Sequence, residues 1–375
     1  MAGIYIHIPF CKQACSYCDF HFSTSFEKYR TRMVKAICKE IEVRKSYLKA
    51  EEIFSIYFGG GTPSVLNAEE IRQLVDSILS NFKVNPKSEI TLEANPDDIN
   101  AERLEDWKKA GVNRLSIGVQ SFRKQDLDWM NRAHTVEEAK SALRLAANYG
   151  FELSIDVIYG LPNFTLEDFK NNLDQVLHFS PAHLSAYCLT VEENTALHKA
   201  VEQGKIVPAN NEAQSEQFDF LVAYLQAKGY EQYEISNFAR EEKYAVHNSN
   251  YWKGEKYLGV GPSAHSFDGY TRSWNIANNA KYMKAIENQE DFYEVEELSI
   301  YDQFNEALLV GLRTKWGVAK HRLPKELLNT EEFRQGIEEF KAEGYLLETE
   351  EVFLLTQKGR LKADGIASDL FILAD

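Results

Sequence analysis

Strand-like and helix-like segments alternate six times through the first half of this 375-residue chain. The expected strands are 3–8, 53–58, 90–95, 114–119, 153–160 and 183–190, and a helical segment follows each of them. Short connections between such units require parallel strands joined by crossover helices. The alternation therefore predicts an α/β fold, although its period alone does not distinguish a doubly wound sheet from a barrel.

Polar residues gather at or just after the carboxyl ends of these expected strands. In chain order they are a cysteine-rich loop, the run Gly59-Gly60-Gly61-Thr62-Pro63, Glu93 with Asn95, Gln120, and Asp156. In α/β barrels the functional groups occupy this edge of the sheet. The pattern favours a partial barrel of six strand–helix units with its site at the carboxyl edge.

The pattern changes after residue 195. Helices are expected at 196–204 and 211–228, followed by a polar, aromatic-rich segment at 230–275 and further helices at 277–288 and 300–313. Residues 316–375 read as helix, helix, short hairpin and helix, an order similar to a winged-helix module. We therefore divide the chain into a barrel (1–195), a connecting region (196–300) and a winged-helix-like module (301–375), the last belonging to a C-terminal α+β region.

Charge excludes some classes of partner. The chain has 42 Lys and Arg against 57 Asp and Glu, a formal net charge of −15. Phosphate-backbone binding depends on Lys and Arg, so neither the chain nor its acidic C-terminal module is expected to bind nucleic acid. No apolar run approaches the ~20 residues of a membrane-spanning helix, and no secretory signal is visible. We expect a cytoplasmic protein without a transmembrane segment, while peripheral membrane contact stays open.

Three of the five cysteines, Cys11, Cys15 and Cys18, fall within eight residues. An odd number of cysteines in a long chain without an export signal argues against a disulfide framework. Cys38 lies in a helical pattern and Cys188 in a strand-like one, so both are expected to be buried structural thiols. The remaining three predict a metal or cluster site.

Two occupants of the cysteine loop are compatible with its spacing. Zinc would require a fourth ligand, which His7, Asp19 or His21 could supply. An iron–sulfur cubane usually takes four cysteines, so three would leave one iron open to an outside molecule. Because soft thiolates suit both occupants, ligand chemistry alone leaves both open.

The sequence context favours the cluster. The segment Cys11-Lys-Gln-Ala-Cys15-Ser-Tyr-Cys18, placed after a first strand, resembles the CxxxCxxC motif of the radical S-adenosylmethionine (SAM) superfamily. The resemblance implies that these three cysteines bind a 4Fe–4S cluster whose open iron chelates the amino and carboxylate groups of SAM. It also implies that one electron from the cluster cleaves SAM to methionine and a 5′-deoxyadenosyl radical.

Further segments extend the resemblance to the SAM site. The Gly59–Pro63 run resembles the segment that contacts the methionine end of SAM, and LEANP, GVQSF, MNRAH and IDVIYGLP complete the set. The resemblance implies SAM contacts from Tyr5, Tyr17, Gly60, Gly61, Thr62, Glu93, Gln120, Arg132 and Asp156. Buried charges are costly without a partner, which agrees with ligand contacts for the charged members of this set.

Two features of the sequence distinguish between the members of one branch of the superfamily. The motifs HIPFC, GGGTPS, EANPD and DVIYGLP resemble the branch of the oxygen-independent coproporphyrinogen III oxidase and its heme-chaperone relatives. The oxidases have a further cysteine two residues past the third, where this chain has Phe20. The run His247-Asn-Ser-Asn-Tyr251-Trp252 matches the HNxxYW signature of the heme chaperones, which implies that His247 is a heme ligand, with His265 as its nearest competitor.

The resemblance therefore implies a heme chaperone with a 4Fe–4S cluster, SAM and heme, an electron donor, and an acceptor protein that receives the heme. The alternative is an oxygen-independent coproporphyrinogen III oxidase, which decarboxylates two propionates. A zinc-stabilised metabolic enzyme is a third, less favoured interpretation. The sequence leaves open whether the chain is an enzyme and which protein accepts the heme.

Overall fold

Six parallel strands form the centre of one curved sheet in the computed structural model, which describes residues 1–374. The strands are β1 (Ala2–Ile8), β2 (Ile53–Gly60), β3 (Val84–Ala94), β4 (Arg114–Gln120), β5 (Glu152–Tyr159) and β6 (His183–Cys188). Each strand pairs in parallel with the next along the chain. The predicted α/β fold with six parallel strands is confirmed.

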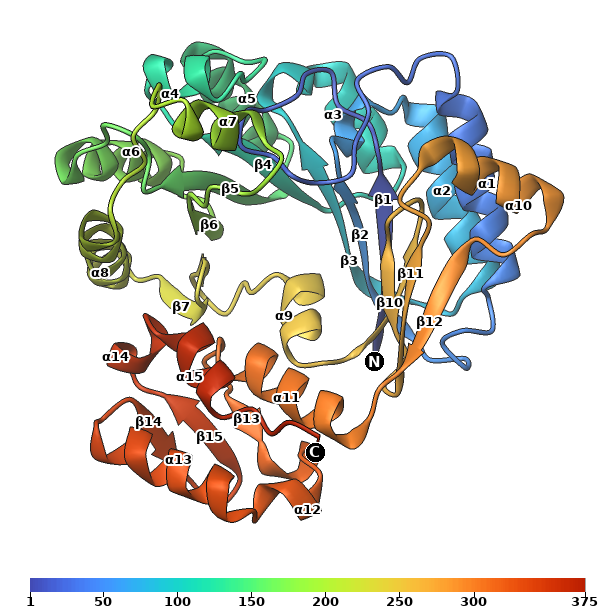
Figure 1. The fold of residues 1–375 in the computed structure, drawn as a ribbon. Helices are drawn as coiled ribbons and strands as arrows, with labels where there is room; N and C mark the ends of the chain where they lie inside the picture. The colour runs from blue at the N-terminus through green and yellow to red at the C-terminus, as the bar shows by residue number, and fades with distance from the viewer. Residues whose placement is uncertain (375) are drawn as a thin grey trace.

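Helices connect these strands and cover the outer face of the sheet (Figure 1). They are α1 (Arg30–Val43), α2 (Ala68–Asn81), α3 (Ala101–Lys109), α4 (Lys124–Trp129), α5 (Val136–Asn148) and α6 (Leu166–His178). Short 3-10 turns at Pro63–Val65 and Pro96–Asp98 precede α2 and α3. Asn67 with Glu70 and Thr135 with Glu138 form capping boxes, so sequence-local hydrogen bonds determine where α2 and α5 begin.

The sheet extends beyond the six parallel strands on both sides. The additional elements are α7 (Ala196–Glu202), α8 (Asn211–Ala227), β7 (Glu231–Glu234), β8 (Asn237–Ala239), α9 (Val246–Trp252), β9 (Lys256–Val260), β10 (His265–Phe267), β11 (Thr271–Asn275), α10 (Asn279–Asn288) and β12 (Tyr293–Glu297). The strand order is β12-β11-β10-β9-β1-β2-β3-β4-β5-β6-β8-β7, with β9 parallel to β1. Since β12 and β7 do not pair with each other in the described residues, the barrel is partial, as predicted.

The segment 230–275 differs most from its sequence-based description. The sequence describes it only as a polar, aromatic-rich segment, and the structure forms β7 to β11 and α9 there. These strands are only three to five residues long. Alternation is read over four to eight residues, so strands of three to five residues give at best a weak periodic signal.

The two faces of the six parallel strands differ in polarity. Side chains on the outer face, such as Ile6, Leu92 and Ile155, are buried in one hydrophobic core with the helices. Those on the inner face include Tyr5, Ser55, Tyr57, Glu89, Glu93, Arg114, Ser116, Glu152, Ser154, Asp156, His183 and Ser185. Barrel interiors are usually packed with branched apolar side chains, so a polar inner face indicates a site rather than a packed core.

A separate hydrophobic cluster stabilises the C-terminal region. Its elements are α11 (Ile300–Gly311), β13 (Val318–Ala319), α12 (Lys325–Leu328), α13 (Glu331–Ala342), β14 (Leu346–Glu348), β15 (Val352–Leu355), α14 (Gln357–Arg360) and α15 (Ala363–Asp369), with a 3-10 turn at Lys320–Arg322. Phe304, Phe333 and Phe353 pack edge to face at the centre of this cluster. The likeness to a winged helix and the three domain boundaries stay predictions.

Within residues 1–374, no helix combines the length and the apolar composition needed to span a bilayer.

Candidate functional site

The three clustered cysteines lie on the loop between β1 and α1, which the barrel anchors at several points. The backbone N–H of Cys11 donates to the carbonyl of Ser23 at 3.1 Å, and that of Ser16 donates to the carbonyl of Met130 at 3.0 Å. The sulfurs also have polar neighbours. Thr62 Oγ1 lies 3.3 Å from Cys11 Sγ, and Arg132 Nη1 lies 3.3 Å from Cys15 Sγ.

The thiols of this loop are partly buried and influence one another. Burial raises the pKa of Cys11 to about 12 and that of Cys18 to about 11, and the charges of the neighbouring cysteines act in the same direction. A group that binds these sulfurs as thiolates must therefore supply positive charge of its own. In residues 1–374, no three His, Cys, Asp or Glu side chains are close enough together to bind a single metal ion.

The glycine run after β2 lies directly against the cysteine loop. The N–H of Gly61 donates to the carbonyl of Ile8 at 2.9 Å, and the N–H of Thr62 donates to the carbonyl of Phe10 at 2.6 Å. A Cβ added to Gly61 would lie 2.6 Å from the Phe10 oxygen, and Gly60 has a φ of +106°. Both positions require glycine, which allows this backbone to approach the loop closely.

Arg132 and Gln120 meet at the carboxyl end of β4. Arg132 Nη2 donates to Asn95 Oδ1 at 2.7 Å and to the carbonyl of Gly118 at 2.8 Å. Its buried Nε–H has no hydrogen-bond partner in the described residues. A Cβ at Gly118 would lie 2.9 Å from Gln120 Nε2, and Gln120 itself has a φ of +66°. This backbone strain is of the kind found where a side chain is held for a ligand.

Two carboxylates, those of Glu93 on β3 and Asp156 on β5, project from the inner face of the sheet. Glu93 accepts a hydrogen bond from the Tyr57 hydroxyl at 2.7 Å, and burial raises the pKa of Glu93 to about 7. Asp156 accepts from Ser116 Oγ at 3.0 Å and from Ser154 Oγ at 3.3 Å, and burial raises its pKa as well. The negative charge of Asp156 also raises the pKa of Glu93, so the two carboxylates share one electrostatic environment.

Two tyrosines of the predicted set border the same space. The Tyr5 hydroxyl lies 3.1 Å from His7 Nδ1, and its ring stacks on Tyr57 with centroids 6.2 Å apart. Tyr17 lies beside Cys15 and Arg132, and burial raises its pKa. The structure thus brings together the cysteines, the glycine run and the polar residues of β3, β4 and β5, and Tyr5 reaches this group from β1 beside Gly59.

His247 enters the same inner face from its amino-terminal end. It lies in the first turn of α9, and its ring stacks on Tyr57 with centroids 5.2 Å apart and planes 26° apart. Its Nδ1 is 2.9 Å from Ser55 Oγ, whereas its Nε2 forms no hydrogen bond in the described residues. Burial lowers the pKa of His247 to about 4, so the imidazole is neutral at neutral pH.

Among the two histidines proposed as a fourth zinc ligand, three of the four ring nitrogens form hydrogen bonds. His7 contacts Tyr5 through Nδ1 and the carbonyl of His21 through Nε2, at 3.1 and 2.9 Å. His21 Nε2 is 2.9 Å from Asn279 Oδ1. These bonds leave His21 Nδ1 and Asp19 as the remaining candidates for the fourth ligand that zinc would need. Cys38, within α1, and Cys188, at the end of β6, are partly rather than fully buried.

Sequence reasoning missed several residues that organise the inner face. They are Ser55, Tyr57, Glu89, Arg114, Ser154, His183 and Tyr233. A signal was present, since polar and apolar residues alternate in FSIYF, EITLE, RLSIG and ELSID. Alternation in a strand predicts two unlike faces, which parallel strands covered on both sides rarely have.

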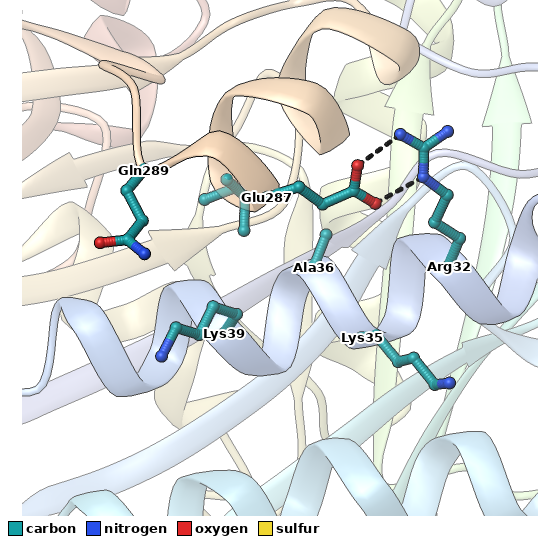
Figure 2. A pocket seen from close by; sticks show the side chains of 7 residues that line it. Arg32, Lys35, Ala36, Lys39, Glu287 and Gln289 are labelled. Carbon is teal, nitrogen blue, oxygen red and sulfur yellow. Dashed lines mark hydrogen bonds and ion pairs between the residues drawn. The ribbon is translucent and has the colours of Figure 1, made fainter.

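One hollow on the outer surface belongs to a different part of the molecule. It has a volume of about 410 Å³ and lies between α1 and α10 (Figure 2). Its main interaction is an exposed ion pair in which Arg32 donates twice to Glu287, at 2.5 and 2.6 Å. None of the predicted site residues lines this hollow.

Comparison with known proteins defines the class first. The family model of the radical SAM superfamily matches residues 5–176, a range that contains the cysteine loop, the glycine run and both carboxylates. The chain also superposes on a solved structure of coproporphyrinogen III oxidase (HemN) from Escherichia coli, a radical SAM enzyme, with a TM-score of 0.86. That match covers 99% of this chain and 90% of the other at 24% identity, and it shows the fold.

Full-length relatives then define the family. The chain is 32% identical to the heme chaperone HemW of Bacillus subtilis (strain 168), with 98% of each chain covered. It is also 32% identical to the heme chaperone HemW of Escherichia coli (strain K12), with 99% of this chain and 98% of the relative covered. The chain belongs to the HemW family of the radical SAM superfamily.

Membership of the superfamily implies a 4Fe–4S cluster and SAM, and the residues present fit both groups. Three thiols on one anchored loop provide the ligands for a cluster. The unpartnered Arg132 Nε–H and the two carboxylates provide polar groups for a small charged ligand. A Cβ at Gly59 would lie 3.2 Å from Glu93 Oε1, so the missing side chain leaves space beside that carboxylate.

Proposed function

We propose that this chain is a heme chaperone that binds heme through His247 and passes it to an acceptor protein. The observation that carries the proposal is the state of the His247 ring. Its Nδ1 is engaged by Ser55 at 2.9 Å, and its Nε2 is left without a partner among the described residues. Metal-ligating histidines typically have one ring nitrogen held by a hydrogen bond, which orients the other towards the metal.

The protonation state of His247 supports the same role. Only neutral imidazole binds iron, and a pKa of about 4 keeps this ring neutral over the physiological range. The Nδ1–H tautomer, which donates to Ser55, presents the Nε2 lone pair to a ligand. Tyr57, stacked on the ring, restricts its orientation further.

Cations and aromatic rings near the end of α9 suit the remainder of a heme. Trp252 ends the helix, and the Arg313 guanidinium lies 5.0 Å from its ring centroid. Lys253 Nζ lies 3.9 Å from the Trp316 centroid and forms no ion pair in the described residues. Heme combines an apolar ring with two propionates, so it needs aromatic surface and cations at its edge.

In the proposed site, Cys11, Cys15 and Cys18 bind the cluster, which supplies one-electron reduction to this end of the barrel when it is bound. Arg132 beside Cys15 and Thr62 beside Cys11 stabilise negative charge on the sulfurs, which raises the reduction potential. SAM contacts come from Tyr5, Tyr17, Gly60, Gly61, Thr62, Glu93, Gln120, Arg132 and Asp156. An electron donor and a heme acceptor complete the proposed set of partners.

The second candidate is the oxygen-independent oxidation of coproporphyrinogen III, which the shared fold favours. Phe20 counts against it, since this position in the oxidases carries a further cysteine. Phe20 is 66% exposed on the loop and contributes no ligand atom.

One sample distinguishes the two candidates. After anaerobic reconstitution, the protein is titrated with heme and separately assayed for coproporphyrinogen decarboxylation. We expect stoichiometric heme binding and no decarboxylation above background. Decarboxylation of coproporphyrinogen over many turnovers would support the oxidase instead.

Variants then test the ligand. His247→Ala should weaken heme binding at least ~10-fold and shift the Soret band, while the iron–sulfur absorbance is unchanged, because the two sites use different residues. His265→Ala is the matched control and should bind heme like the wild type. The reverse result, with loss only in His265→Ala, would transfer the ligand role to His265.

A further inference from the structure

Two paths of side chains on the inner face of the sheet join the carboxylates of the proposed SAM site to α9. The shorter path runs through Tyr57. Its hydroxyl donates to Glu93 Oε1 at 2.7 Å, and the face of its ring stacks on His247 at 5.2 Å. One rigid side chain therefore touches a residue of each proposed site.

The longer path is a chain of five hydrogen bonds through His183 and Tyr233. Ser154 Oγ lies 3.3 Å from Asp156 Oδ1 and 2.8 Å from His183 Nδ1, and His183 Nε2 lies 2.8 Å from the Tyr233 hydroxyl. Two further bonds, at 3.3 and 3.0 Å, continue the path to α9. In these, Asn248 Nδ2 donates to the Tyr233 oxygen and Trp252 Nε1 donates to Asn248 Oδ1.

The donors in this chain point in one direction. Trp252 Nε1 and Asn248 Nδ2 can only donate, so the Tyr233 hydroxyl, which accepts from Asn248, is free to donate to His183 Nε2. His183 then donates from Nδ1 to Ser154, whose hydroxyl donates to Asp156. The order requires a neutral His183, and burial lowers the pKa of His183 well below its ordinary value. The chain therefore ends on the Asp156 carboxylate, with one donor and one acceptor at each of its five links.

Packing does not account for these groups. His183 and Tyr233 are buried at 1% and 0% exposure, where apolar residues would fill the barrel without desolvation of polar atoms. The chain also reaches two members of the HNxxYW run, Asn248 and Trp252, rather than ending on backbone. Because consecutive members share a hydrogen bond, one cannot shift without disturbing the next.

We propose that Tyr57, His183 and Tyr233 are positioning residues that couple ligand binding at Glu93 and Asp156 to the placement of α9. A ligand that fixes these two carboxylates fixes the hydrogen bonds that they accept, and thus the orientation of Tyr57 and His183. The inference rests on the proposed function, in which SAM binds at the carboxylates and heme binds at His247. Under that function, SAM orders α9 and increases the affinity for heme, and heme increases the affinity for SAM by the same factor.

Amide hydrogen exchange tests the coupling without heme. In anaerobically reconstituted full-length protein, saturating SAM should slow exchange in residues 246–252 at least ~3-fold. Heme titrations with and without SAM should differ about 5-fold or more in affinity, the lower limit of typical coupling between sites. Bound SAM is measured separately by equilibrium dialysis.

Hydroxyl deletions identify the residues. Tyr57→Phe keeps the ring stacked on His247 but removes the bond to Glu93, and Tyr233→Phe breaks the longer path. The double variant should reduce both SAM effects to less than ~2-fold while still binding SAM, and each single variant should show a partial loss. Tyr159→Phe is the control, since Tyr159 is also buried, lies on the outer side of β5 and belongs to neither path.

The outcomes separate this inference from the proposed function. If wild-type protein binds SAM but α9 exchange and heme affinity are both unchanged by it, the coupling is wrong while heme binding stands. If heme does not bind but SAM still slows α9 exchange through Tyr57 and Tyr233, the proposed function is wrong and the coupling stands. Full coupling in both single variants, or loss of coupling in Tyr159→Phe, would also overturn the inference, as would failure of the wild type to bind SAM.

Discussion

At the scale of single residues, the ring of His247 differs from that of His183 because one of its nitrogens forms no hydrogen bond in the described residues. His183 uses both ring nitrogens, bonded to Ser154 and Tyr233 at 2.8 Å each, and so has no lone pair for a ligand. His247 uses only Nδ1. A Cβ at Gly3 would lie 3.1 Å from that atom and 2.8 Å from Ser55 Oγ, so even the neighbouring glycine is needed for the placement of the ring.

The cysteines provide the first residue-scale prediction. Replacement of Cys11, Cys15 or Cys18 by Ala should abolish the iron–sulfur chromophore of anaerobically reconstituted protein, because each residue would supply one of three ligands. Cys38→Ala and Cys188→Ala serve as controls and should keep the chromophore, since Cys38 lies in α1 and Cys188 at the end of β6. Absorbance together with iron and sulfide analysis measures the effect. Stoichiometric zinc without iron in the wild type would contradict it.

Glu93 gives a pH-dependent prediction. Burial raises its pKa from 4.5 to about 7, so the folded protein binds this proton more tightly than the unfolded chain. Stability falls with pH wherever the folded state binds more protons, here from about pH 4.5 through 7. Between pH 5 and pH 8, cluster-free wild type should lose ~1–3 kcal/mol more unfolding free energy than Glu93→Gln, with partial exposure allowed for. Urea denaturation at both pH values measures this, and an equal loss in the two proteins would refute the raised pKa.

At the scale of elements, the parallel strands and their helices were predictable, and the elements around α9 were not. Segments such as 114–119 and 183–190 differ from β4 and β6 by only one or two residues, because long apolar runs bounded by caps are strong signals. α1 begins at Arg30 rather than near residue 26. The strands β7 to β11 depend on pairing with β6 and β1, which local sequence does not encode.

The candidate site was predictable to a similar extent. Short motifs indicated Cys11, Gly61 and Arg132, and the structure places these residues around one space. Tyr57 and His183 carry no motif, and their importance depends on partners far along the chain. Contacts between distant segments decide such roles, so they become visible only in the folded molecule.

α9 gives the element-scale prediction. This seven-residue helix has no side-chain cap of its own, and Glu89 of β3 instead accepts from the N–H groups of Val246 and His247 at 2.8 and 3.1 Å. Glu89→Ala removes both bonds and a favourable charge at a helix N-terminus, which should cost α9 ~1–3 kcal/mol of local stability. Amide exchange in residues 246–252 should therefore accelerate at least ~5-fold.

Glu152→Ala is the matched control for this variant. Like Glu89, Glu152 lies 3.8 Å from Arg114, but it has no hydrogen bond to α9. The control should leave exchange in α9 within ~2-fold of the wild type. Equal acceleration in both variants would mean that Arg114, rather than the bond to the helix, determines the stability of α9.

At the scale of the whole molecule, a buried polar cluster joins α1 to the part of the sheet formed by β9–β11 and to α10. Glu40 of α1 accepts from Tyr282 Oη at 2.5 Å, from Asn275 Nδ2 at 2.8 Å and from the N–H of Gly261 at 2.8 Å. Arg44 donates from Nη2 to Ser273 Oγ at 3.0 Å and lies beside Glu40. These bonds connect α1 to β11, to α10 and to the loop after β9, all of them more than 200 residues away in sequence.

The last prediction concerns this cluster. Glu40→Ala leaves an uncompensated Arg44 and several donors without acceptors in the interior, so it should cost ~3–5 kcal/mol of global stability. Arg32→Ala, on the same helix, removes only the exposed pair with Glu287 seen in Figure 2 and should cost less than ~1 kcal/mol. Urea denaturation of both variants, monitored by far-UV circular dichroism, measures the difference.

Because the cluster joins the barrel to β9–β11, the loss in Glu40→Ala should appear as one cooperative transition at lower urea. A separate early transition confined to residues 256–297 would show instead that this side of the sheet unfolds independently, and that Glu40 does not unite the two parts.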